Sequence, residues 1–188
     1  MSNTSSSKST TRRILIACIG NIFLGDDGFG VEVARRLARK RYPEGVQVVD
    51  FGIRGMELAY TLLDDYDTLV LVDAVPRGGA PGTLYLIEPD LSNMSPEKGV
   101  EAGRVAVDTH SMDPVKVLAF SRTLGTLSGG QVTQPIYTLL VGCEPSPFGG
   151  GEDYAEMQMG LSEPVQAAVD EAVKMIDSLV EKLLQTTA

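Results

Sequence analysis

Short apolar runs alternate with amphipathic segments along the first half of the chain. The runs predict strands, and they lie at residues 14–19, 46–51 and 68–75. The first is a continuous apolar run and the third contains another, as in strands that are buried on both faces of a sheet. Between the runs, apolar residues recur every three or four positions, which predicts helices at residues 29–42 and 55–65. The alternating residues 82–89 follow after a short turn and predict an antiparallel neighbour.

The second half of the chain continues this alternation after an irregular stretch at residues 90–107. A helix is predicted at residues 113–124 and a last strand at residues 137–143. Ser162 is expected to cap a long C-terminal helix that carries apolar residues at helical spacing. Strands that alternate with helices predict an α/β fold, a three-layer α/β/α sandwich.

The polar, low-complexity residues 1–13, MSNTSSSKSTTRR, predict a disordered tail, so that a single domain spans residues 14–188. The tail ends in Arg12 and Arg13, and the apolar ILIACIG that follows superficially resembles a twin-arginine export signal. However, the apolar run soon meets Asn21, and no small-residue cleavage site follows it. We therefore interpret the arginine pair as the basic end of the tail, ahead of the first core strand.

The composition of the chain indicates which partners are disfavoured and in which compartment the protein is expected. The chain has 188 residues and a net charge of −9, which argues against nucleic acid and anionic membranes as partners. No run approaches the roughly 20 apolar residues of a membrane span. The only cysteines, Cys18 and Cys143, lie in apolar runs, which favours buried free thiols in a reducing compartment and hence a cytoplasmic location.

The stretch NIFLGDDGFG, residues 21–30, lies where a nucleotide-binding protein would have its phosphate loop. Gly20 and Gly25 have the spacing of that motif, but the required Lys and Ser/Thr are replaced by Asp26 and Asp27. Two carboxylates would repel a triphosphate, so nucleotide binding is excluded. One aspartate is explained as the N-cap of the following helix. The other lies at the carboxyl end of a central strand, where a carboxylate can bind a cation.

Two further side chains extend this candidate site. Asp73 ends the apolar run LVLVD and should open onto the same sheet edge as Asp27, although it could also be a turn residue. His110, the only histidine, lies in a loop before the third predicted helix. Two carboxylates and one imidazole suit Ni, Zn, Fe or Mn. A catalytic pair of Cys143 with His110 is conceivable, but a buried core thiol is the favoured interpretation of Cys143.

The sequence after the tail resembles the hydrogenase maturation proteases, endopeptidases that trim the large subunit of nickel–iron hydrogenases. The resemblance rests on ILIACIGNIFLGDDGFGVEVARRL, DFGIRGMEL, LVLVDAV, THSMDPVKVL and GLSEPVQAAVDEAV. It assigns the family's metal-contacting and catalytic residues to Asp27, Asp73 and His110. Gly20, Asn21, Asp26 and Gly28 are expected to support the loop around them.

The resemblance also implies a mixed five-stranded sheet and a partner, the precursor of a hydrogenase large subunit. Nickel would belong to that substrate and would not be stably bound by the free enzyme, which removes a short C-terminal extension after nickel insertion. Two positions depart from the family pattern. Residue 27 is Asp where some members have Glu, and Ile53 stands where many have the Thr of a Gly-Gly-Thr motif.

Two other functions use the same residues. One is a checkpoint chaperone that binds the nickel-loaded large subunit without cutting it. The other is a general peptidase of related fold. In the favoured function, either the metal polarises the peptide carbonyl or one carboxylate acts as a general base on water.

Overall fold

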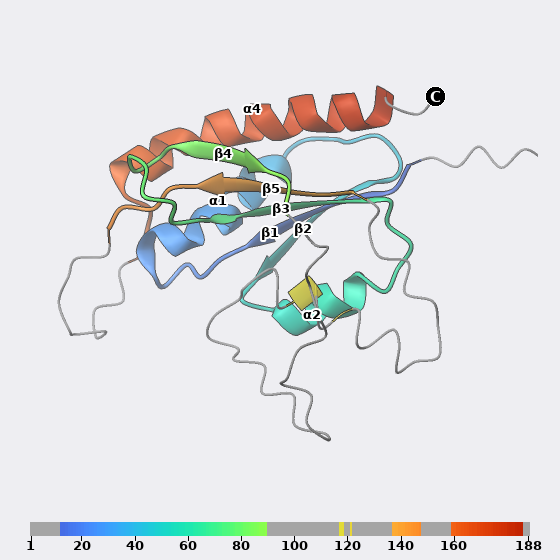
Figure 1. The fold of residues 1–188 in the computed structure, drawn as a ribbon, viewed down its shortest axis with the longest axis horizontal. Helices are drawn as coiled ribbons and strands as arrows, with labels where there is room; N and C mark the ends of the chain where they lie inside the picture. The colour runs from blue at the N-terminus through green and yellow to red at the C-terminus, as the bar shows by residue number, and fades with distance from the viewer. Residues whose placement is uncertain (1–11, 90–116, 119–120, 122–136, 148–158, 186–188) are drawn as a thin grey trace, which may run out of the picture.

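A computed structural model gives the fold of the chain, and it describes residues 12–89, 117–118, 121, 137–147 and 159–185 (Figure 1). Five strands form one sheet in the order β2-β1-β3-β5-β4. Their bounds are β1 Ile14–Ile19, β2 Val46–Gly52, β3 Thr68–Ala74, β4 Leu84–Ile87 and β5 Tyr137–Cys143. All the strands are parallel except β4, which runs antiparallel to β5. The predicted mixed sheet of five strands is therefore confirmed.

Helices cover both faces of this sheet. Helices α1, Phe29–Leu37, and α4, Glu163–Gln185, pack on one face, and α2, Gly55–Thr61, packs on the other (Figure 1). Successive residues of β1 point to opposite faces, and each residue is buried under one of the two helical layers. The predicted three-layer α/β/α sandwich is confirmed. In the part of the chain that the structure describes, no helix has the length and apolarity to cross a bilayer.

Two helices are shorter than the sequence pattern predicts, for local reasons. Helix α1 ends at Leu37 and does not extend to Tyr42. Pro43 disfavours helical geometry at the residue before it, and the Tyr42 hydroxyl instead donates a 2.7 Å hydrogen bond to Asp177 of α4. Helix α2 ends at Thr61, whose hydroxyl donates back to the carbonyl of Glu57 at 2.9 Å. Such back-bonding competes with the helical ladder.

The neighbour of β4 differs from the expected one. The short turn after β3 predicted that residues 82–89 would lie beside the strand they follow, but β4 pairs with β5. β5 in turn occupies the place next to β3 with seven residue pairs in parallel register. Of the helix predicted at residues 113–124, the structure describes Val117, Leu118 and Ser121, which are helical and buried. The rest of that helix lies outside the described residues.

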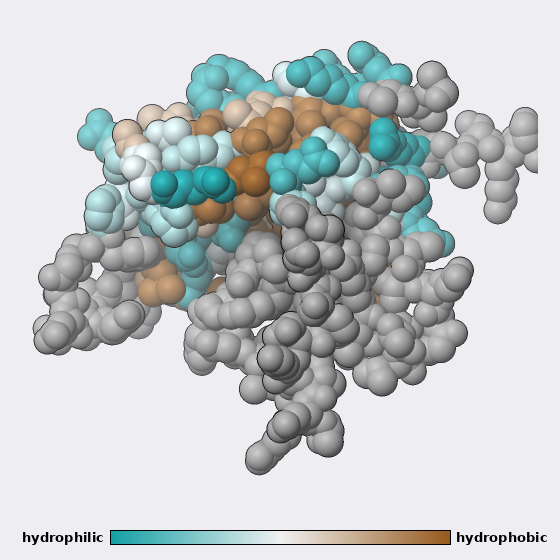
Figure 2. Space-filling model, viewed as in Figure 1, coloured by the Kyte–Doolittle hydropathy of each residue, from teal (hydrophilic) through white to brown (hydrophobic). Residues whose placement is uncertain are grey.

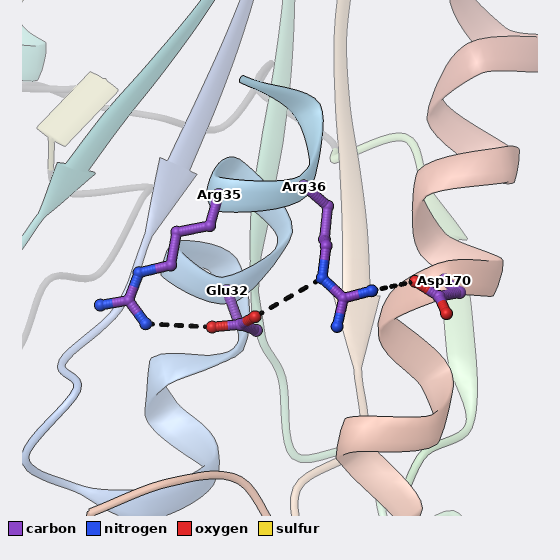
Figure 3. Close-up of polar contacts among 4 residues, drawn as sticks. All are labelled: Glu32, Arg35, Arg36 and Asp170. Carbon is purple, nitrogen blue, oxygen red and sulfur yellow. Dashed lines mark hydrogen bonds and ion pairs between the residues drawn. The ribbon is translucent and has the colours of Figure 1, made fainter. Parts of the chain in front are cut away.

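The two helices on the shared face, α1 and α4, are also joined by charged side chains (Figure 3). Arg36 of α1 forms an ion pair with Asp170 of α4 at 2.6 Å, and Glu32 contacts both Arg35 and Arg36. These side chains are partly exposed, and such pairs contribute about 0–1 kcal/mol each. Most of the stabilisation of this face therefore comes from its apolar cluster.

The arginine pair assigned to the tail contacts the folded domain. The guanidinium of Arg12 donates a 2.8 Å hydrogen bond to the carbonyl of Leu183 near the end of α4. The Arg13 guanidinium lies 4.8 Å from the centre of the Tyr66 ring, and its N–H donates to Asp67 at 2.7 Å. These contacts place both arginines in the ordered part of the domain.

Gly30, in the first turn of α1, allows that helix to cross the ends of two strands. A Cβ atom at this position would lie 2.0 Å from the carbonyl oxygen of Ile19 and 2.5 Å from that of Val72. These atoms belong to the backbones of β1 and β3, which cannot easily move apart. The absence of a side chain at residue 30 therefore sets how closely α1 approaches the sheet.

We predict that Gly30→Ala lowers the free energy of unfolding by about 3 kcal/mol or more, the upper range for overpacked cores. Gly28→Ala is the matched control, because its Cβ would come no closer than 3.3 Å to another residue. Gly28→Ala should lower the free energy of unfolding by less than about 1 kcal/mol. Urea unfolding of the two variants measures both values, and equal losses would contradict the role given to Gly30.

Candidate active site

The carboxyl ends of β1 and β3 form a switch point in the sheet. These neighbouring strands are parallel, and the chain leaves β1 to enter α1 on one face. Val117 and Leu118, which come after β3 and β4, pack on the opposite face with α2. Open α/β sheets hold their ligands where connections diverge in this way. Asp27 follows β1 and Asp73 lies near the end of β3, so the fold brings both predicted carboxylates to this edge.

A 3-10 helix, η1 at Gly25–Gly28, holds Asp27 beside the end of β1 and against β3. The backbone N–H of Asn21 donates to the carbonyl of Asp27 at 3.2 Å and to its carboxylate at 2.9 Å. Gly20 has a φ of 145°, and a Cβ there would lie 2.0 Å from the Asp27 carbonyl oxygen. The loop can therefore fold back onto Asp27 only with glycine at residue 20.

Asp26 points away from Asp27 and binds two distant segments. Its carboxylate accepts hydrogen bonds from the N–H of Ser146 at 2.8 Å and from the N–H of Ser162 at 2.6 Å. The Ser162 hydroxyl donates to it as well, at 2.8 Å. Burial alone would raise the pKa of Asp26, but these bonds outweigh it and hold the pKa below its ordinary value. Asp26 therefore links η1 to the end of β5 and the start of α4.

The N-cap interpretation of the aspartate pair is wrong for α1. The residue that precedes α1 is Gly28, and no side chain caps the helix. Ser162 does precede α4, and its carbonyl accepts the N–H of Gln166 at 2.8 Å. Its hydroxyl, however, is bonded to Asp26 and Ser146. The carboxylate that satisfies a donor at the start of α4 thus comes from η1.

Asp27 has the opposite electrostatic environment. The residue is half-buried, and one hydrogen bond from Asn21 does not offset its loss of water. Burial therefore raises the pKa of Asp27 above its ordinary value. A carboxylate with a raised pKa is a stronger base, and it also gains more from a nearby cation. Of the two neighbouring aspartates, Asp27 is the one suited to chemistry.

The structure describes Asp73 but not His110, the two other residues of the predicted site. Asp73 is buried, and its carboxylate accepts the N–H of Ala74 at 2.8 Å. His110 lies outside the described residues. Among the residues that are described, no three His, Cys, Asp or Glu side chains are placed to hold a metal ion together. The described geometry thus brings Asp27 and Asp73, two of the three residues predicted to contact the metal, to one sheet edge.

Glu144 is a buried acid at the same edge that the sequence analysis missed. It directly follows β5, and its carboxylate accepts the N–H groups of Arg77 and Gly78 at 2.8 and 3.0 Å. The Tyr85 hydroxyl donates to it at 2.8 Å. Burial would raise the pKa of Glu144, but these bonds hold it below its ordinary value. With its oxygens engaged in this way, Glu144 fixes the loop after β3 and is a poor candidate for a ligand.

The thiol of Cys143 is unsuited to nucleophilic catalysis. Cys143 ends β5 and is fully buried. Burial raises its pKa to about 12, with smaller contributions from the negative charges of Asp26 and Glu144. The thiolate is the reactive form of cysteine, and it is not populated at neutral pH with such a pKa. This supports the interpretation of Cys143 as a core residue.

We predict opposite effects on stability for the two neighbouring aspartates. At pH 7, Asp26→Asn should lower the free energy of unfolding by about 1–3 kcal/mol, because a buried donor loses its acceptor. Asp27→Asn should leave the melting temperature unchanged or raise it, since it removes a charge that burial disfavours. Thermal unfolding of both variants measures these shifts.

The pH dependence of stability tests whether the pKa shifts of Asp26 and Asp27 cause these effects. The lowered pKa of Asp26 stabilises the fold above the ordinary pKa of a carboxyl, and that contribution is lost as the pH falls through the folded-state pKa. The raised pKa of Asp27 costs stability above its folded-state value and nothing below the ordinary one. Both variants should therefore approach the wild type in acid, from opposite sides. Equal destabilisation of the two at pH 7 would contradict these assignments.

Comparisons with known proteins agree with the fold. Residues 31–179 match the HycI family model, described as hydrogenase maturation protease. This range begins just after the loop with Asp26 and Asp27, and it includes Asp73 and His110. The chain is 31% identical over 171 residues to a Methanocaldococcus jannaschii protein provisionally named a hydrogenase maturation protease, covering 90% of this chain and 97% of that one.

Two further relatives are similar. The hydrogenase expression/formation protein HoxM of Azotobacter vinelandii is 33% identical over 175 residues, which cover 92% of this chain and 75% of HoxM. The solved structure of the hydrogenase maturating endopeptidase HybD from E. coli has the same fold, with a TM-score of 0.65 and 24% identity over 90% of this chain and 93% of HybD. The chain therefore belongs to the hydrogenase maturation protease family of endopeptidases.

Proposed function

We propose that this protein removes the C-terminal extension of a nickel–iron hydrogenase large-subunit precursor after nickel has been inserted. The observation that carries the proposal is the pairing of Asp27 and Asp73 at the carboxyl ends of two adjacent parallel strands. Family membership supplies the class of reaction, and these two acids supply oxygen ligands at the place where such sheets bind ligands.

Nickel enters this proposal as part of the substrate. Asp27 and Asp73, with His110, would contact the nickel of the precursor and hold the neighbouring peptide against the sheet edge. Two carboxylates and one imidazole make a weak site for a free ion, because three ligands that are mostly oxygen donors bind nickel less tightly than a set rich in nitrogen or sulfur. A precursor that already carries the metal provides the remaining ligands, so only the loaded precursor would be held.

The chemical step follows from the environment of Asp27. Water attacks the carbonyl carbon of the scissile peptide bond, and the Asp27 carboxylate accepts the proton that this water loses. The same proton then passes to the leaving nitrogen as the C–N bond breaks, which leaves a carboxylic acid and an amine that exchange a proton to become carboxylate and ammonium. The raised pKa of Asp27 makes it the more basic of the two neighbouring aspartates and therefore the better general base of the pair.

The first test is cleavage of a purified large-subunit precursor, with and without nickel. We expect cleavage of the loaded precursor only, and an Asp27→Asn rate about 10²–10⁴-fold lower, the range for a lost acid–base group. Asp170→Asn is the matched control, because it removes a carboxylate from the exposed α1–α4 contact and should cut at the wild-type rate (Figure 3). Mass spectrometry of the products measures the cut.

Each alternative function predicts a different outcome of this test. Equal cleavage of loaded and nickel-free precursor would favour a general peptidase. Capture of the loaded precursor without any cut would favour a checkpoint chaperone.

The second test concerns His110, the only imidazole in the chain. We expect His110→Ala to lose both cleavage and capture of the loaded precursor, with little change in melting temperature. Because a protonated imidazole cannot bind a metal, wild-type capture should weaken as the pH falls below about 6.5, the ordinary pKa of histidine. Pull-down across this pH range and thermal unfolding measure the two effects. A His110→Ala protein that cuts at the wild-type rate would contradict the proposal that His110 contacts the nickel together with Asp27 and Asp73.

A further inference from the structure

Exposed apolar side chains concentrate beside the candidate site. Among the described residues, seven large apolar side chains are exposed, and five of them lie on the segments that leave β1 and β2 at the carboxyl edge. These five are Phe23, Leu24, Ile53, Met56 and Tyr60, which we call the apolar rim. A surface that gathers apolar side chains in this way is typical of a binding site.

Helix α2 is apolar on two sides, and only one of them is needed for the fold. Leu58 and Ala59 are buried in the cluster beneath the sheet. Ile53, Met56 and Tyr60 recur at spacings of three and four residues and stay exposed. A helix that only covers a sheet needs a single apolar face. The exposed side of α2 therefore has no role in the core and is available to a partner.

Backbone hydrogen bonds connect the apolar rim to Asp27. The N–H of Phe23 donates to the side-chain oxygen of Asn21 at 3.0 Å, and the N–H of Asn21 donates to the Asp27 carboxylate at 2.9 Å. The two segments of the rim are also joined, because the N–H of Gly20 donates to the carbonyl of Gly52 at 3.1 Å. The apolar rim therefore lies beside Asp27 at the carboxyl edge of the sheet.

The charges around the apolar rim favour an apolar peptide over a second copy of this chain. The charged residues of α2 near the rim, Arg54 and Glu57, form an ion pair with each other at 2.8 Å. Because these two charges neutralise each other, they do not favour a charged partner at the rim. Two copies that each carry a net charge of −9 would repel one another.

We propose that the apolar rim binds an apolar segment of the precursor next to the scissile bond, and so selects which precursor is cut. This inference rests on the proposed function and deepens it by naming the specificity surface. The apolar rim would act in substrate binding and not in the chemical step, because it would contact the substrate beside the scissile bond and not at it. Its loss should raise KM and leave kcat unchanged.

The experiment compares Phe23→Ser and Ile53→Ser with Leu86→Ser. Leu86 is a matched control: it is 51% exposed, close to the 47% of Phe23 and the 56% of Ile53. It lies on β4, the strand at the far edge of the sheet from β2. Figure 2 shows apolar surface over β4 and α4. Steady-state cleavage of nickel-loaded precursor gives KM and kcat, and thermal unfolding confirms that each variant is folded.

We expect KM to rise about tenfold in each rim variant, the loss of one well-packed apolar contact, with kcat within about twofold of the wild type. Ile53→Leu should retain the wild-type KM, and Leu86→Ser should change neither constant. Rim variants that match Leu86→Ser, or that lower kcat alone, would overturn the inference while the cleavage itself stands. Wild-type protein that does not cut the precursor would instead overturn the proposed function.

The oligomeric state provides a second check. A wild-type dimer in sedimentation that Ile53→Ser converts to a monomer would overturn the inference, because the rim would then join two copies of the chain. A wild-type monomer at the concentrations of the cleavage assay supports it.

Discussion

The carboxylate of Asp26 joins three parts of the chain that are far apart in sequence. Ser146 and Ser162, its donors, lie 120 and 136 residues further along, at the end of β5 and the start of α4. The conformation of η1 therefore depends on contacts that exist only once the last strand and helix are in place. Asp27 is held by the same short helix, so the geometry of the candidate site is a property of the complete domain and not of the local sequence.

Backbone packing restricts the same region from the other side. Gly20 lets the loop approach the carbonyl of Asp27, and Gly30 lets α1 rest on the ends of β1 and β3. Between these two glycines the loop has little freedom to shift. Two identical side chains consequently acquire different properties: Asp26 is saturated by donors, whereas Asp27 is partly dehydrated with one backbone donor. Neighbouring acids whose pKa values are pushed apart can divide support and chemistry between them.

Much of the fold could be predicted because it depends on local patterns. Strands β1 and β5 have the predicted bounds, since each is a nearly unbroken apolar run that ends at a polar or glycine residue. The place of β4 beside β5 could not be predicted, because strand pairing depends on segments distant in sequence. The helix ends were also missed, since a proline and a threonine hydroxyl oppose the apolar spacing there.

The candidate site, too, could be predicted only in part. Asp27 could be found because it follows an apolar strand, and Asp73 because it lies near the end of another. Parallel strands present their carboxyl ends at one edge of the sheet. Glu144 has the same position after β5 and could have been found by that rule. The function of Glu144 in holding the loop after β3 could not be predicted. Its donors, from Arg77, Gly78 and Tyr85, come together only in three dimensions. The same holds for the partners of Asp26.

The bond between Arg12 and the carbonyl of Leu183 brings the two ends of the ordered domain together. Both lie near the amino end of β1, whereas Asp27 and the apolar rim lie at its carboxyl end (Figure 1). Sequence added at either end of the domain would thus emerge on the side opposite the candidate site. The domain can accordingly be attached to a surface or a carrier through these ends while the carboxyl edge of the sheet stays open, and the ends are close enough for a short linker to produce a circular permutant.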